Sequence, residues 1–266
     1  QTCALPISAA LLVTSLGGGD VAWSSPTVLS LAVAAVGLAG LAVVQERRAT
    51  DPILAPHLFT NRGFATCNAV SMLGAFAFVG FTAYLPIYFQ LVHGVSALNS
   101  GFLVLPSFLI WPLVSVPVGR IVAATGRYKL FPLMGTALSA GCVLLLAFVV
   151  TPATPLWVAV TLTGLVSVGA GAVGPVILLA GQNAVEPRDV GAATGAYSFF
   201  RNLGASFGLA LLGTMAVAGM DARVKLIPGH ETLGAKPGAE LLHAGATAID
   251  LAPPAIREAV IAAMAG

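Results

Sequence analysis

The stretch Gly119-Arg-Ile-Val-Ala-Ala-Thr-Gly-Arg-Tyr-Lys129 separates two long apolar runs, residues 97–118 and 130–150. It carries three cations, Arg120, Arg127 and Lys129, whereas the two runs carry none. Runs of about 20 apolar residues are long enough for a helix to cross the hydrocarbon core of a bilayer. We therefore interpret the stretch as a short polar loop between two membrane-crossing helices.

The composition supports this interpretation for the whole chain. Hydrophobic residues make up 58% of the 266 residues and charged residues only 8%, and the mean hydropathy is +0.95. A soluble domain carries about 25% charged residues. We expect an all-α, polytopic transmembrane helical bundle that is embedded in the lipid bilayer. The net charge of +2 is spread over loops and forms no basic patch, so we do not expect nucleic-acid binding.

The apolar runs predict about six complete spans and a partial first helix. The partial helix, residues 8–16, is too short to cross a bilayer. The complete spans are residues 25–44, 64–92, 97–118, 130–150, 156–180 and 191–218. Residues 219–266 are a polar tail that ends in a short amphipathic run.

The cations predict the orientation of these spans. All Lys and Arg residues of the short loops fall on alternate loops, namely residues 45–63, 119–129 and 181–190. The opposite loops, residues 17–24, 93–96 and 151–155, contain neither Lys nor Arg. Because cations near spans are retained on the cytoplasmic side, we expect the first three loops to be cytoplasmic. By alternation, the tail 219–266 is extracytoplasmic.

The two ends of the sequence predict a fragment. Residues 1–7 match, in frame, the translation of a common sequencing adapter, and we exclude them from fold reasoning. The chain then begins within an apolar run and stops without a closing helix. The alternative for the beginning, a cleavable signal, would need a cation before the apolar run, and none is present.

The loop at residues 119–129 also resembles a loop signature of the major facilitator superfamily, Gly-x-x-x-Asp-x-x-Gly-Arg. Gly119, Gly126 and Arg127 match this signature, and Arg120 follows its first glycine. The acidic position is Ala123 here, so the ion pair that this aspartate makes elsewhere in the family is absent from this copy.

Other stretches are similar to the fourteen-helix branch of that superfamily, the drug:proton antiporters. They include Leu58-Phe-Thr-Asn-Arg-Gly-Phe64 in a loop, Tyr84-Leu-Pro-Ile-Tyr-Phe-Gln90 and Gly94-Val-Ser-Ala-Leu-Asn-Ser-Gly101 in the following helices, and Arg201-Asn-Leu-Gly204 near the end. Their order and spacing, more than any one motif, carry the resemblance, which covers residues 11–217.

The resemblance implies a domain organisation. Residues 8–44 would hold a partial helix and a linker helix that join two halves, 45–63 a cytoplasmic loop, and 64–218 five helices of the C-terminal bundle. Residues 219–266 would be the loop before a missing final helix. The N-terminal bundle of the same protein, which carries the antiporter motif and the coupling acids, would be an absent partner.

The resemblance also implies a function, that of a transporter in the bacterial inner membrane that exports drug-like or lipophilic compounds by alternating access. It would be driven by a proton gradient and would need no cofactor. A transporter of another solute, such as an osmolyte, sugar or lipid precursor, is the first alternative. A non-transporting membrane scaffold is the second, and it would have a filled interior.

Arg201 is the strongest candidate site residue, because it lies about ten residues into the last span. A charge at that depth costs several kcal/mol, so it normally faces a bundle interior or a watery cavity. It would either line the transport path or tie helices together through backbone carbonyls. Further candidates for the substrate cavity are Asn68, Ser71, Phe76, Phe81, Tyr84, Tyr88 and Asn202. The alternative for the aromatic residues is contact with lipid or membership of the interfacial aromatic belt.

Small residues predict close helix contacts. The candidate packing glycines are Gly164, Gly169, Gly171, Gly174, Gly204 and Gly208, with helix bending as the alternative role. The cysteines and histidines have no metal-ligand spacing, and the histidines are isolated on the predicted loops. No serine has a nucleophile-elbow context, so we expect neither a metal site nor an enzyme.

Overall fold

The computed structural model describes residues 56–126, 128–148, 151 and 154–224, together with isolated positions between 25 and 44. The predictions for residues 1–24, for Arg47 and Arg48, for Arg127 and for the tail beyond Val224 therefore lie outside the described residues. Half of the predicted span 25–44 lies outside them too, and all of its described positions except Ser25 are helical.

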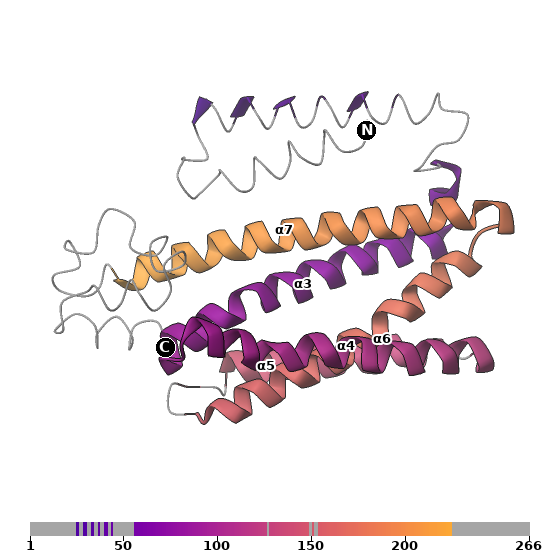
Figure 1. Cartoon of the computed structure of the whole chain (residues 1–266). Coiled ribbons are helices and arrows are strands. Elements are labelled where there is room, and N and C mark those ends of the chain that lie inside the picture. The colour runs from indigo at the N-terminus through magenta and orange to yellow at the C-terminus, as the bar shows by residue number, and fades with distance from the viewer. Residues whose placement is uncertain are drawn as a thin grey trace. The chain divides into compact units, whose positions relative to one another are not determined.

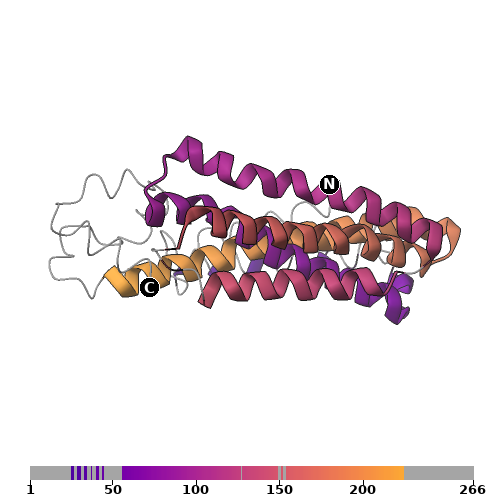
Figure 2. The ribbon, with the colours of Figure 1, turned by 90° about the horizontal axis from the view of Figure 1, so that it is seen from below.

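The described chain consists of helices. Five long helices follow a 3-10 turn, η1 (Pro56–Thr60), and a second 3-10 turn, η2 (Pro187–Asp189), precedes the last of them. The long helices are α3 (Arg62–His93), α4 (Ala97–Thr125), α5 (Leu130–Phe148), α6 (Leu156–Asn183) and α7 (Val190–Val224), drawn from two sides in Figures 1 and 2. All five are long and apolar enough to cross a membrane, and the described ranges contain no strand. The predicted all-α membrane fold is confirmed.

One predicted loop is shorter in the structure than expected. Helix α4 continues through Gly119 and Arg120 to Thr125, so only residues 126–129 connect it to α5. The helix ends at Gly126, which has a φ of 68° and donates its N–H to the Val122 carbonyl over 2.9 Å. This left-handed conformation favours glycine and closes the last turn. Of the residues that predicted a loop, Gly119 and Arg120 thus lie in the final turns of a helix, whereas Lys129 lies in the connection.

Three other helix ends also extend beyond their predicted limits, whereas the starts of α4, α5 and α6 are as predicted. Helix α3 begins at Arg62, inside the predicted loop 45–63, and α6 runs to Asn183 in the predicted loop 181–190. Helix α7 extends to Val224, beyond the predicted end at 218. Hydropathy detects the lipid-facing part of a helix, whereas backbone hydrogen bonds continue into the polar ends.

The chain divides into two compact units, and α3, α6 and α7 contribute to both. Unit 1 contains residues up to 81 and 177–214, and unit 2 contains residues 82–176 and those from 215 onward. Each unit has its own packing.

In unit 1, α3 and α7 contact each other through glycines (Figure 1). A Cβ on Gly204 would overlap the Met72 backbone carbonyl, and one on Gly208 would overlap that of Phe76. A Cβ on Gly80 would in turn lie 2.9 Å from the Gly208 carbonyl oxygen. We call this contact of Met72, Phe76 and Gly80 with Gly204 and Gly208 the glycine seam. It brings two backbones together with no side chain between them.

In unit 2, glycines of α6 likewise bring its backbone into close contact with α5 and α4. A Cβ on Gly169 would overlap Gly135 and Ser139 of α5, and one on Gly171 would lie 2.8 Å from the Trp111 carbonyl oxygen of α4. Ser139 also donates its hydroxyl to the Val166 carbonyl over 2.9 Å. Large apolar side chains of α4 and α5 point outward, up to Phe148 at 82% exposure. Such a surface suits a lipid solvent rather than water.

Candidate functional site

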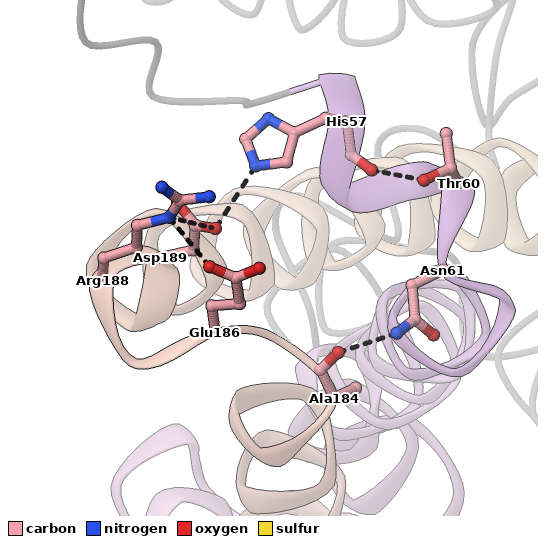
Figure 3. Close-up of polar contacts among 7 residues, drawn as sticks. All are labelled: His57, Thr60, Asn61, Ala184, Glu186, Arg188 and Asp189. Atoms are coloured by element: carbon pink, nitrogen blue, oxygen red, sulfur yellow. Dashed lines mark hydrogen bonds and ion pairs between the residues drawn. The ribbon is translucent and has the colours of Figure 1, made fainter.

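A polar contact between two loops holds the ends of α3, α6 and α7 in unit 1. The η1 turn lies against the connection between α6 and α7 (Figure 3), where His57 Nε2 is 3.3 Å from Asp189 Oδ2. Asn61 donates its Nδ2 to the Ala184 carbonyl over 2.7 Å. We call His57, Asn61, Ala184 and Asp189 the loop clasp. It joins segments that lie more than 120 residues apart in the chain.

Asn61 has a second role in the loop clasp. Its Oδ1 accepts the backbone N–H of Gly63 over 2.9 Å, which satisfies a donor of the first turn of α3. Beneath it lies a buried apolar cluster made of Leu58, Phe64, Ala193 and Ala196. The side chain of Phe59 extends this cluster, and its ring lies edge-on to those of Phe64 and Phe200. Apolar burial, more than the exposed polar pairs, therefore fixes η1 in place.

The loop clasp corrects one prediction. His57, expected to be isolated, is paired with Asp189, and Arg188 lies beside this pair (Figure 3). The Arg188 Nε is 3.0 Å from a Glu186 carboxylate oxygen and 3.9 Å from that of Asp189. The local sequence around His57 holds no signal for this pairing, because the partner is 132 residues away.

Asn68 and Ser71 lie in the buried face of α3, with 3% and 8% exposure. Asn68 donates its Nδ2 to the Phe64 carbonyl over 3.0 Å. Its Oδ1 has no hydrogen-bond partner among the described residues. The Ser71 side chain interacts with the side chain of Tyr197 on α7. Ser71 therefore faces α7, whereas the Asn68 amide bonds to its own helix.

Arg201 lies one helical turn after Tyr197 and interacts with it electrostatically. It is the twelfth residue of α7, so at a rise of 1.5 Å per residue it lies about 17 Å from the helix start. The side chains of Arg201 and Asn202 are both exposed on unit 1. Arg201 is thus an exposed cation about 17 Å along α7, and its assignment to the transport path stays a prediction.

The aromatic candidates on α3 are half-buried. Phe76 belongs to the glycine seam, and Phe81 follows it near the end of the unit 1 portion. Tyr84 and Tyr88 belong to unit 2, where the Tyr88 ring centroid lies 5.7 Å from those of Phe89 and His93. Their assignment to a substrate cavity stays a prediction.

The remaining predicted positions divide into packing and loop residues. Gly164 and Gly174 approach Ile110 and Trp111, at 3.2 and 3.5 Å from a built Cβ, and Gly169, Gly171, Gly204 and Gly208 make the closer contacts described above. In the loop signature, Gly119 and Arg120 are helical and Gly126 ends α4. Arg127 lies outside the described residues.

Sequence reasoning missed two groups of residues. Tyr197 is not among the predicted site residues, although its spacing of four from Arg201 places both residues on one face of α7. Gly80 and Gly135 were not selected either, yet each faces the backbone of another helix. For the glycines no local signal exists, because the contact is defined by the partner helix. No group of three metal-ligating side chains occurs in the described part of the chain.

Comparison with known proteins identifies the family. The family model described as Major Facilitator Superfamily matches residues 2–209. An uncharacterized MFS-type transporter of Mycobacterium tuberculosis is 37% identical over 242 residues, which are 90% of this chain and 35% of that protein. The multidrug transporter protein MdtP of Bacillus subtilis is 32% identical over 85% of this chain and 42% of its own length.

A tetracycline resistance determinant of Streptomyces rimosus is 34% identical over 76% of this chain and 58% of its own length. The chain therefore spans between about one third and three fifths of these relatives. The resemblance inferred from the sequence motifs is confirmed by these matches.

Proposed function

Because the chain belongs to the Major Facilitator Superfamily, we propose that it is part of a transporter that exports drug-like or lipophilic compounds across a membrane. The observation that carries this proposal is the match of 85% of the chain to a protein named as a multidrug transporter. The resistance determinant of Streptomyces rimosus supports the same class of substrate. Five helices of membrane-crossing length make the chain a multi-pass membrane protein.

The proposed organisation is that of one bundle of a two-bundle transporter. Residues 64–218 form five helices of the C-terminal bundle, residues 8–44 belong to the connection between bundles, and an N-terminal bundle completes the protein. Transport proceeds by alternating access between the bundles. A proton gradient supplies the energy, with no organic cofactor. The bacterial relatives support a location in the inner membrane, with the loops 45–63, 119–129 and 181–190 on the cytoplasmic side.

Arg201 is the residue whose role we propose first. Its side chain is exposed on α7, and at the mid-span depth that we propose for it, insertion costs several kcal/mol unless water or a polar group surrounds the cation. In a transporter, a charged residue whose insertion into the membrane is this costly is typical of the transport path. The half-buried rings of Phe76, Phe81 and Tyr84 on α3 would bind lipophilic cations by stacking and cation–π attraction.

The test uses this chain together with the upstream region of its gene, expressed in an efflux-deficient bacterial host. We expect Arg201→Ala to reduce proton-driven dye export by about tenfold or more, a loss of about 1.4 kcal/mol or more. Arg188→Ala is the matched control, because Arg188 is an exposed loop cation paired with Glu186. If both variants export dye at the wild-type rate with equal expression, Arg201 has no transport role.

A second measurement compares transport by this chain alone with transport by the longer gene product. The 266-residue chain alone, reconstituted in proteoliposomes, is expected to show no proton-coupled dye flux, since alternating access needs two bundles. Flux by the chain alone would contradict the proposed organisation. If the longer gene product moves an osmolyte or sugar but no dye, the substrate class is wrong while the transporter assignment stands.

A further inference from the structure

Two cations where α4 meets α5 have no acidic partner within these helices. Arg120 and Lys129 are both exposed, and neither forms an ion pair with a described residue. The sequence contains no Asp or Glu between residues 52 and 185, so α3, α4, α5 and α6 supply no acid. Arg127, which lies between the two cations in sequence, is outside the described residues.

The acids elsewhere in the chain do not supply the missing charge. In the loop 181–190, which belongs to the same predicted membrane face, both acids already have partners, Arg188 and His57. In the loop 45–63, two acids stand against three arginines. Asp221 lies near the end of α7, which the alternation of the spans assigns to the opposite face. The counter-charge of Arg120 and Lys129 must therefore come from outside the chain.

Arg120 lies at the end of an apolar stripe on α4. Leu109, Leu113 and Val116 are each more than half exposed, and their spacing of four and three residues places them on one helix face with Arg120. Arg120 is the twenty-fourth residue of α4, about 35 Å from the helix start at a rise of 1.5 Å per residue. The hydrocarbon core of a bilayer is about 30 Å thick. The stripe therefore spans the depth of the acyl chains, and Arg120 reaches the level of the phosphates.

The start of α5 has the same arrangement. Lys129 directly precedes the helix, whose first residues Leu130, Leu133 and Met134 are each more than half exposed. Tyr128 beside Lys129 is exposed as well, and an aromatic ring at this level is typical of the membrane interface. On both helices, an exposed apolar surface thus ends in a cation.

We propose that the connection between α4 and α5 binds an anionic phospholipid. The lipid phosphate contacts Arg120 and Lys129, and the acyl chains lie along the exposed apolar surfaces of the two helices. The connection consists of residues 126–129, so the two helix ends are at most about 18 Å apart. A zwitterionic lipid would bring a cation of its own, whereas an anionic lipid compensates the two cations. The site requires only a chain inserted in a bilayer and is independent of the exported compound.

The experiment is photo-crosslinking of the 266-residue chain in phosphatidylcholine bilayers. The probe is a trace of phosphatidylglycerol that carries a diazirine on its headgroup, and mass spectrometry of the digested chain locates the attached lipid. We expect the label to be concentrated on residues 120–134. An excess of unlabelled phosphatidylglycerol should remove this label, whereas the same amount of added phosphatidylcholine or of inorganic phosphate should not.

Variants then test the two cations. Arg120→Gln and Lys129→Gln should each lower the labelling of residues 120–134 by about fivefold, because one Lys or Arg near an anionic lipid surface changes the affinity by about that factor. The matched control is Arg188→Gln, which removes an exposed cation that already pairs with Glu186, and its labelling should equal that of the wild type. Lys129 lies outside the helices and Arg120 is exposed, so neither change removes a packed side chain.

Three results would overturn the proposal. Displacement of the probe by phosphatidylcholine would mean that ordinary boundary lipid occupies the connection. Displacement by inorganic phosphate would mean a site for a free anion and not for a lipid. Unchanged labelling in both Arg120→Gln and Lys129→Gln would mean that these cations do not hold the headgroup. The competition uses the wild-type chain, so it decides the question even if a variant does not fold.

Discussion

The glycine seam predicts a specific loss of stability in Gly204→Ala. The added methyl group would overlap the Met72 carbonyl and would lie 2.9 Å from the Met72 Cα. These are backbone atoms, so no side-chain rotation can relieve the overlap. The two helices must separate, and the contacts of the neighbouring Gly208 with Phe76 would be weakened as well.

The magnitude follows from two opposing terms. Overpacking a well-packed contact costs about 1–3 kcal/mol, and a backbone overlap belongs at the upper end. Alanine has a higher helix propensity than glycine, and this difference offsets about 1 kcal/mol of the overpacking cost. We therefore expect a net loss of about 2 kcal/mol. For a chain of this size, that lowers the melting temperature by about 4–8 °C.

The assay is thermal unfolding in detergent, followed with a maleimide dye that fluoresces on reaction with a thiol. With Cys3 and Cys67 replaced by serine in all variants, the remaining thiol is Cys142, which is 5% exposed and becomes reactive as the chain unfolds. The matched control is Gly219→Ala in the same helix, where an added Cβ has nothing within 4 Å. It should melt at or a few degrees above the wild-type temperature, since only the propensity term of about 1 kcal/mol remains.

The comparison of the two variants decides whether the reasoning holds. If Gly204→Ala melts at or above the wild-type temperature, the close approach of α3 and α7 is not required for stability. If Gly219→Ala loses as much as Gly204→Ala, the effect belongs to glycine in general and not to the seam.

Three further changes test the turns and the loop clasp by the same thermal assay. Asn61→Ala removes bonds to Gly63 and Ala184 and should cost about 1–2 kcal/mol, whereas Asn61→Asp keeps the first bond and should cost less. Gly126→Ala should cost about 1 kcal/mol because of the left-handed φ of 68°, whereas alanine at a helical glycine with open space around it should not destabilise. His57→Ala should change stability by less than about 1 kcal/mol, because the His57 side chain is 62% exposed; a loss above about 2 kcal/mol would contradict a weak surface pair.

The sequence was sufficient to predict the helical membrane fold and the order of the described spans. Their centres follow from hydropathy, because lipid contact selects apolar residues over about 20 positions. The ends of the helices do not follow from hydropathy. Arg120 in the last turns of α4 has the composition of a loop residue, although the backbone remains hydrogen-bonded as far as Gly126.

The site was less predictable than the fold. Asn68 and Ser71 were selected as polar residues within a span, but nothing in an almost uniformly apolar helix indicates which face meets α7. The pairing of His57 with Asp189 likewise depends on two turns brought together by the fold. Both features are set by contacts distant in sequence, which a local pattern does not contain.

The glycine seam also limits how α3 and α7 can be misassembled. A displacement of α7 by one residue would bring Ala205 and Leu209 opposite the carbonyls of Met72 and Phe76, where even a methyl group is too large. A displacement by one helical turn would leave only one glycine opposite these two carbonyls. The two helices therefore have one alignment at close range, and a newly inserted α7 that stops elsewhere remains loosely attached. The glycine seam therefore selects one alignment of α3 and α7 when the bundle assembles.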